Sequence, residues 1–193
     1  MARVREFDTE SAVHAAMEAF RCKGYEGTSV QDLVDATGVG RGSLYGAFGS
    51  KEGLYLAALE RYRQLYAVPL IDMLRAGAPA RDLLREVLVA TVDGIVRDGD
   101  RKSCLIVGAT TERVSQDPKV AAHVRSTTVS LEDALRDVIA TAQAEGQLSG
   151  ARDARDLARY LIVTMHGLRV MGATNADRAS LMSVVDAALG ALD

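Results

Sequence analysis

The segment from Thr37 to Tyr55 reads TGVGRGSLYGAFGSKEGLY and places six glycines among side chains that can bind phosphate. Two kinds of glycine-rich loop bind nucleotide phosphates. A P-loop requires a lysine directly after a glycine, so that the ammonium and the backbone N–H groups converge on one phosphate, but no lysine of this chain follows a glycine. The dinucleotide fingerprint requires three glycines at fixed spacing after a strand, and Ser43 or Tyr45 stands at its third position. Both nucleotide-binding loops are therefore excluded.

The same segment fits two short helices joined by a tight turn. Thr28 and Gln31 have the spacing of a capping box, which predicts a helix that starts at Thr28, and Gly38 favours the end of that helix. A second short helix is expected over residues 40–48. The apolar residues that would face a common core are Val30, Leu33, Val34, Leu44 and Phe48.

Two short helices in this order are typical of the helix-turn-helix, whose second helix enters the major groove of DNA. Gly42 and Gly46 would leave one face of that helix thin, and the Arg41 guanidinium matches the two acceptors of guanine. The alternative is a three-helix packing unit with glycines at its turns, in which Tyr45 packs in the core and Lys51 is a solvated helix end. The expected DNA contacts come from Thr28, Arg41, Gly42, Ser43, Tyr45 and Lys51.

The segment TSVQDLVDATGVGRGSLYGAFGSKEGL, from Thr28 to Leu54, resembles the DNA-binding signature of TetR-type bacterial transcriptional regulators. The resemblance covers roughly the first third of the chain. It implies a helix-turn-helix domain over residues 1–50 and a ligand-binding and dimerisation domain over residues 51–193. It also implies a homodimer whose last two helices pair with their symmetry mates in a four-helix bundle.

The rest of the chain repeats its apolar residues at helical spacing, which predicts an all-α fold of about nine helices. The first helix is expected from Asp8 or Thr9 to Gly24. A longer helix capped by Ser50 would carry an apolar stripe. Its members are Leu54, Ala58, Leu59, Tyr62, Leu65 and Tyr66.

Two aliphatic stripes lie near the end of the chain. One contains Leu157, Leu161 and Leu168, and the other runs from Leu181 to Leu189. Such stripes suit the dimer interface that the resemblance implies, and their alternative is the core of one subunit.

The sequence says less about a ligand than about DNA binding. Cys104 follows Arg101 and Lys102, and positive charge nearby lowers the pKa of a thiol; the alternative is a buried packing cysteine, which is also expected for Cys22. Core packing is the alternative for every other ligand candidate. The candidates are Tyr62, Tyr66, Cys104, Thr110, Arg113, Tyr160 and His166, with Met73, Met165 and Met171 beside them.

Composition narrows the class of protein. The net charge of −3 gives no global sign of nucleic-acid binding, so a DNA interface depends on local charges. Arg3 and Arg5 would form a minor-groove arm or a disordered end. No apolar run is long enough for a membrane span and no signal peptide is recognisable, so a cytoplasmic protein without membrane contact is expected.

No cofactor or metal is expected, because His14, His123 and His166 lie far apart without ligand-type neighbours. No catalytic grouping of Ser, His and Asp is visible, which argues against an all-α enzyme. The favoured function is a homodimeric repressor that a small-molecule inducer releases from double-stranded operator DNA. A repressor that senses electrophiles or oxidants through Cys104 is the alternative.

Overall fold

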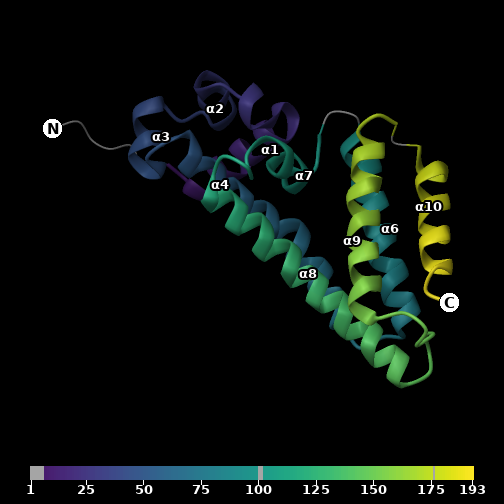
Figure 1. Ribbon diagram of the computed structural model, residues 1–193. Coiled ribbons are helices and arrows are strands. Elements are labelled where there is room, and N and C mark those ends of the chain that lie inside the picture. Colours follow the sequence, from purple (N-terminus) through teal and green to yellow (C-terminus); the bar gives the residue numbers. More distant parts are fainter. Residues whose placement is uncertain (1–6, 100–101, 176) are drawn as a thin grey trace. The chain divides into compact units, whose positions relative to one another are not determined.

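The computed structural model describes residues 7–99, 102–175 and 177–193 (Figure 1). The expected all-α class is confirmed: no strand occurs within these ranges. The elements are α1 (Thr9–Gly27), α2 (Val30–Thr37), α3 (Arg41–Phe48), α4 (Lys51–Tyr62), the π-helical turn η1 (Arg63–Ala67), α5 (Val68–Leu74), α6 (Ala80–Asp98), α7 (Leu105–Glu112), α8 (Pro118–Ala144), α9 (Ala154–Gly172) and α10 (Arg178–Gly190). None of the described helices is long and apolar enough to cross a membrane.

The chain folds into two compact units. The first contains Met1–Leu65 with Ser103–Val124, and the second contains Tyr66–Lys102 with Arg125–Asp193. The helix-turn-helix therefore shares its unit with α4, α7 and the first residues of α8.

The first unit is built around α1, which packs against α2, α4 and α7 (Figure 1). Its core contains fully buried Met17 and Phe20 from α1. The ring of Phe20 lies 4.8 Å from that of Tyr55 on α4, in an edge-to-face arrangement that stabilises the pair beyond its buried area. Leu33 of α2 and Leu44 of α3 are also buried. The two short helices thus attach to the core through one leucine each.

The expected start of α1 is confirmed, since the Asp8 carboxylate accepts the Glu10 N–H as N-cap. At Gly24 the backbone leaves the helix with φ +72° and ψ 175°, a conformation that only glycine adopts readily. Helical geometry resumes for one turn to Gly27. A β-carbon at Gly24 would also contact Glu112 Oε1, so the Glu112 side chain would have to move to admit it.

The predicted capping box was wrong by one residue. Ser29, not Thr28, caps α2: the Asp32 N–H donates to the Ser29 hydroxyl, and the Ser29 N–H donates to the Asp32 carboxylate. Thr28 is fully buried and its hydroxyl donates to the Gly24 carbonyl oxygen at 2.6 Å. The kink at Gly24 leaves that carbonyl without a helical partner, and the Thr28 hydroxyl supplies one.

Two further expectations are corrected in the first unit. The apolar stripe of α4 does not continue to Leu65, which is 37% exposed, because η1 changes the helical register after Tyr62. Cys22 is exposed rather than packed, because its neighbours Phe20 and Arg21 occupy the buried side of α1.

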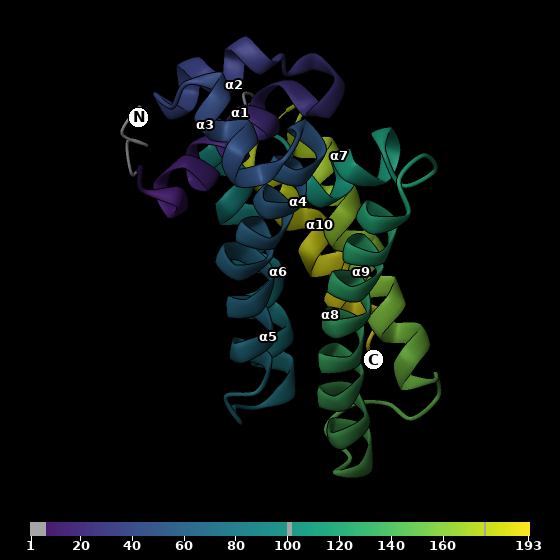
Figure 2. The same cartoon turned by 90° about the vertical axis from the view of Figure 1, so that its left-hand side faces the viewer.

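The second unit packs α6 against α5, α9 and α10 (Figure 2). The leucine stripes near the end of the chain are core of the same subunit: Leu157, Leu161, Leu168, Leu181 and Leu189 are all buried in one cluster with α6 and α8. Of the two alternatives, the structure bears out the core of one subunit for these leucines.

We expect Gly24→Ala to lower the free energy of unfolding by about 1–3 kcal/mol, because alanine is strained at this backbone geometry. The measurement is urea denaturation followed by circular dichroism. Gly27→Ala is the matched control, since it lies in the same helix without positive φ and with only ordinary contacts around its β-carbon. Equal stability of the two variants would contradict the interpretation.

Candidate nucleic-acid interface

The turn between α2 and α3 is fixed by backbone and side-chain hydrogen bonds. Gly38 adopts the left-handed conformation at φ +67°, and its N–H donates to the Val34 carbonyl. The Thr37 hydroxyl donates to the Leu33 carbonyl at 2.7 Å and accepts the Val39 N–H at 3.2 Å. The direction in which α3 leaves the turn is therefore set locally.

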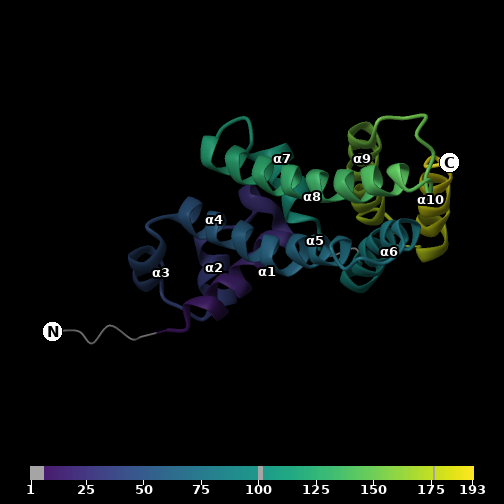
Figure 3. The same ribbon diagram turned by 90° about the horizontal axis from the view of Figure 1, so that it is seen from below.

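The α3 helix is exposed on the side away from the core (Figure 3). Leu44 is 2% exposed and points inward. Gly42 and Gly46 lie one turn apart on the outer side, and a β-carbon at either position would meet no atom within 4 Å. The Arg41 guanidinium carbon lies 5.3 Å from the centroid of the Tyr45 ring, one turn further along. The outer face is thus thin, because two of its positions carry no side chain. The Arg41 guanidinium lies over the Tyr45 ring at the start of the helix.

The start of α4 approaches the end of α3 closely. The Ser50 hydroxyl accepts the Gly53 N–H at 3.2 Å as N-cap of α4. A β-carbon on Gly53 would lie 2.0 Å from the Phe48 carbonyl oxygen, so only glycine fits. This approach places Lys51, in the first turn of α4, directly after the end of α3.

The Lys51 ammonium lies 4.2 Å from the centroid of the Tyr25 ring. Tyr25 is 5% exposed, and its hydroxyl donates to Glu52 Oε1 at 2.9 Å. Burial, followed by this hydrogen bond, raises the pKa of the Tyr25 hydroxyl far above its usual value. Hydrogen bonds from its own backbone N–H, from Ser50 and from Tyr25 hold the pKa of the Glu52 carboxyl below its usual value. The tyrosine is therefore neutral and the glutamate ionised near neutral pH.

The structure places five of the six predicted DNA contacts on one continuous stretch, α3 and the start of α4. Thr28 lies apart from them, buried beneath the start of α2. Ser29 is the exposed residue there, and the sequence pattern that identifies it is Ser29 with Asp32 at capping-box spacing. Arg3 and Arg5 lie outside the described residues.

The predicted ligand residues are divided between the two units. Four of them belong to the first unit: Tyr62, Cys104, Thr110 and Arg113. The other three belong to the second unit: Tyr66, Tyr160 and His166.

Several of these side chains have internal roles. Tyr62 is 3% exposed beneath the Arg21 guanidinium, and the Thr110 hydroxyl donates to the Ile106 carbonyl. Cys104 is 8% exposed, which favours packing over reactivity. Burial, with a smaller contribution from Arg169, lowers the pKa of His166, so its imidazole is neutral at pH 7. No group of three potential metal ligands lies together in the described part of the chain.

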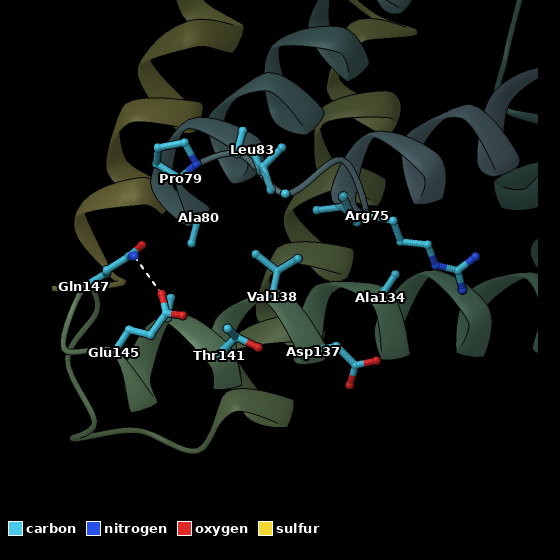
Figure 4. A pocket seen from close by; sticks show the side chains of 14 residues that line it. Arg75, Pro79, Ala80, Leu83, Ala134, Asp137, Val138, Thr141, Glu145 and Gln147 are labelled. Carbon is cyan, nitrogen blue, oxygen red and sulfur yellow. Dashed lines mark hydrogen bonds between the residues drawn. The ribbon is translucent and has the colours of Figure 1, made fainter.

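An open cavity of about 610 Å³ lies in the second unit, between the connection from α5 to α6 and the last turns of α8 (Figure 4). Val138 and Ala80 contribute apolar surface, and Thr141 and Asp137 are polar residues of the α8 wall. None of the predicted ligand residues lines this cavity.

A capped pair of short helices with an exposed, thin second helix defines a helix-turn-helix DNA-binding protein. Comparisons with known proteins identify the family. The family model described as "Bacterial regulatory proteins, tetR family" matches residues 12–58, and that described as "Tetracyclin repressor-like, C-terminal domain" matches residues 80–188. The chain belongs to the TetR family of DNA-binding transcriptional regulators.

Similar proteins of known sequence cover the whole chain. The uncharacterised HTH-type transcriptional regulator YezE of Bacillus subtilis is 34% identical over 100% of both chains. The HTH-type transcriptional repressor ComR of Escherichia coli is 27% identical over 97% of this chain and 90% of its own. Among solved structures, a cysteine mutant of the TetR-family regulator CifR in complex with 26-base-pair operator DNA is 31% identical, with a TM-score of 0.88 over 99% of this chain and 100% of its own.

We expect Gly46→Ala to raise the free energy of unfolding by about 0.5–1 kcal/mol, because alanine favours helix more than glycine, and to weaken DNA binding because the added methyl group thickens the outer face. Chemical denaturation and fluorescence anisotropy with labelled operator DNA measure the two effects. Gly94→Ala in α6 is the control, as its β-carbon also has ordinary surroundings; it should stabilise without changing DNA affinity. Undiminished affinity of Gly46→Ala would show that this face does not approach the bases.

Proposed function

We propose that this protein is a homodimeric repressor that binds operator DNA through α3 of each subunit and dissociates when a small-molecule inducer binds. The observation that carries the proposal is the thin outer face of α3, with Arg41 at its start and Lys51 just beyond its end. The CifR complexes with operator DNA, at 30–31% identity, support the DNA partner.

The DNA contacts divide into two kinds. Arg41 is the proposed base reader, since its planar fork matches guanine and stacking on Tyr45 limits its freedom. Ser43, Tyr45 and Lys51 are proposed phosphate contacts, which set affinity and position rather than sequence preference. Thr28 is left out of this group, because its hydroxyl donates to the Gly24 carbonyl inside the protein.

The exposed face of α9 supports the homodimer. Tyr160, Val163, Val170 and Met171 are 41–68% exposed. They are separated by three, seven and one residues, which at about 3.6 residues per turn places them on one side of α9, opposite the buried leucines. Contiguous apolar surface of this kind marks an interaction site. We therefore place the dimer interface on this face rather than on the leucine stripes.

The proposed dimer also explains how an inducer could release the protein from DNA. Two recognition helices that bind half-sites one helical turn apart cannot tolerate a change in their spacing. The α4 helix carries Lys51 at its start, and the chain passes from the first unit to the second in η1, directly after α4. An inducer that shifts this connection would move Lys51 and α3. No catalytic step is proposed, and the burial of Cys104 argues against a thiol sensor.

DNA binding is tested with duplexes from the region beside the protein's own gene. We expect Lys51→Ala to weaken binding to all duplexes and to lower the salt slope of log K by about 1, because one phosphate contact is lost. Arg41→Ala should cost about 1–3 kcal/mol for the preferred operator and relax sequence preference. Lys119→Ala, on an exposed lysine at the start of α8, is the matched control. Unchanged binding by both Lys51→Ala and Arg41→Ala would remove the proposal.

The dimer is tested by placing a charge on the exposed α9 face. Val163→Arg should convert the dimer to a monomer in analytical ultracentrifugation, because the two-fold axis brings two like charges into one apolar interface. Val129→Arg on α8 is the control, since Val129 is 44% exposed outside this face. A dimeric Val163→Arg variant would place the interface elsewhere.

A further inference from the structure

Tyr25 carries two cations from distant parts of the sequence. The Lys51 ammonium lies 4.2 Å from its ring centroid and the Arg113 guanidinium carbon lies 4.3 Å from it. Lys51 is the proposed phosphate contact, whereas Arg113 follows α7 and has no part in the helix-turn-helix. All three residues belong to the first unit. Two positive charges close to one ring repel each other, so negative groups nearby must offset this repulsion.

The Tyr25 ring is a rigid support. It is buried, it stacks on Phe20 at 6.1 Å, and it contacts Tyr55 edge-on at 4.8 Å. Its hydroxyl donates to Glu52, the residue next to Lys51. The ring is therefore held by packing on two sides and tied to the first turn of α4 by this hydrogen bond.

Arg113 is held by acidic residues as well as by the ring. Its Nη1 lies 3.4 Å from Glu26 Oε1 and its Nη2 lies 3.7 Å from Asp117 Oδ2. Its side chain is only 14% exposed, and its buried Nε has no hydrogen-bond partner within the described structure. The guanidinium thus gives up one hydrogen bond to lie against Tyr25, which indicates that the ring and the carboxylates determine its position.

The turn that carries Arg113 is itself attached to α1. Glu112 Oε2 accepts the Glu26 N–H at 3.0 Å, and Glu112 Oε1 occupies the space that a side chain at Gly24 would fill. At the other end of α7, the Ser103 N–H donates to the Arg21 carbonyl at 3.0 Å. The α7 segment therefore bridges the kink in α1 on both sides.

Lys51 differs from Arg113 in its partners. No carboxylate of the described residues lies within ion-pair distance of the Lys51 ammonium, which lies against the Tyr25 ring instead. If Arg113 were neutral, Glu26 and Asp117 would lack their cation while Lys51 remained on the same ring. Attraction to these carboxylates would then compete with DNA phosphate for the ammonium.

We propose that Arg113 is a positioning residue for DNA binding. Beside the Tyr25 ring, its guanidinium neutralises the Glu26 and Asp117 carboxylates, and this keeps the Lys51 ammonium available to a phosphate of the operator. This inference rests on the proposed role of Lys51 and extends the DNA-binding machinery to the segment after α7. Arg113 acts through Lys51 and does not itself touch DNA.

The experiment is a double-mutant cycle on operator affinity, measured by fluorescence anisotropy at several salt concentrations with the full-length protein. Arg113→Gln should weaken binding about threefold to tenfold in the wild-type background and lower the salt slope, as loss of the Lys51 contact does. In the Lys51→Ala background the same change should alter affinity by less than about twofold. Arg113→Lys, which keeps the charge, should bind like the parent.

A second substitution, Glu26→Gln, tests whether the lost DNA affinity can be restored. Glu26 is an exposed side chain, and the Arg113→Gln/Glu26→Gln variant should recover most of the lost affinity because the competing carboxylate is gone. Arg113→Met is compared in parallel because it keeps apolar contact with the ring, and thermal unfolding by circular dichroism monitors folding.

The outcomes separate this inference from the proposed function. Failure of Lys51→Ala to weaken binding would remove the phosphate role of Lys51, and with it both proposals. If Lys51→Ala weakens binding but Arg113→Gln has no effect, or has an equal effect in both backgrounds, only the positioning role falls. Failure of both neutral variants to fold would make Arg113 a structural residue and would equally overturn its positioning role.

Discussion

The recognition helix keeps its place because the first turn of α4 reaches the end of α3 at a distance that only glycine allows. Gly53 packs its backbone against the Phe48 carbonyl, and its N–H is satisfied by the Ser50 hydroxyl. A side chain at this position would force α4 away from α3. The buried residues Leu54 and Tyr55 follow directly, so the displacement would also disturb the core of the unit. One close backbone approach thus couples the position of α3 to the packing of α4.

This support matters because α3 is weak as an isolated helix. It has eight residues, two of them glycines, and its N-cap Gly40 makes no side-chain hydrogen bond. A segment this short does not stay helical in water by propensity alone. Burial of Leu44 and the fixed turns at both ends therefore hold it. The outer face makes no packing contacts within the protein, so the fold does not require side chains there. Gly42 and Gly46 can therefore occupy this face, although glycine lowers the stability of the helix.

Much of this arrangement was predictable from the sequence, because local signals determine it. The Asp8 cap, the turn at Gly38 and the all-α class follow from residue type and periodicity. The capping box was misplaced because adjacent Thr28 and Ser29 both satisfy the cap pattern, and only the buried bond from Thr28 to the kink distinguishes them. The leucine stripes of α9 and α10 stayed open between the core and a dimer interface for another reason: periodicity locates an apolar stripe but does not say which partner covers it. Tertiary contacts over long sequence separation, such as Arg113 on Tyr25, leave no local signal.

On the proposed function, the assignment of α7 to the first unit would give an inducer signal a second route to the operator. The chain passes between the two units at three places, after Leu65, after Lys102 and after Val124. The first lies in η1 and the third lies within α8, so both are helical connections. A helix transmits a displacement along its axis, whereas a flexible loop absorbs it. On the proposed function, a shift of α8 in the second unit would be carried to its start at Pro118, one turn after Arg113. On the proposed function, the signal would then reach α3 from α1 and Tyr25 as well as through α4.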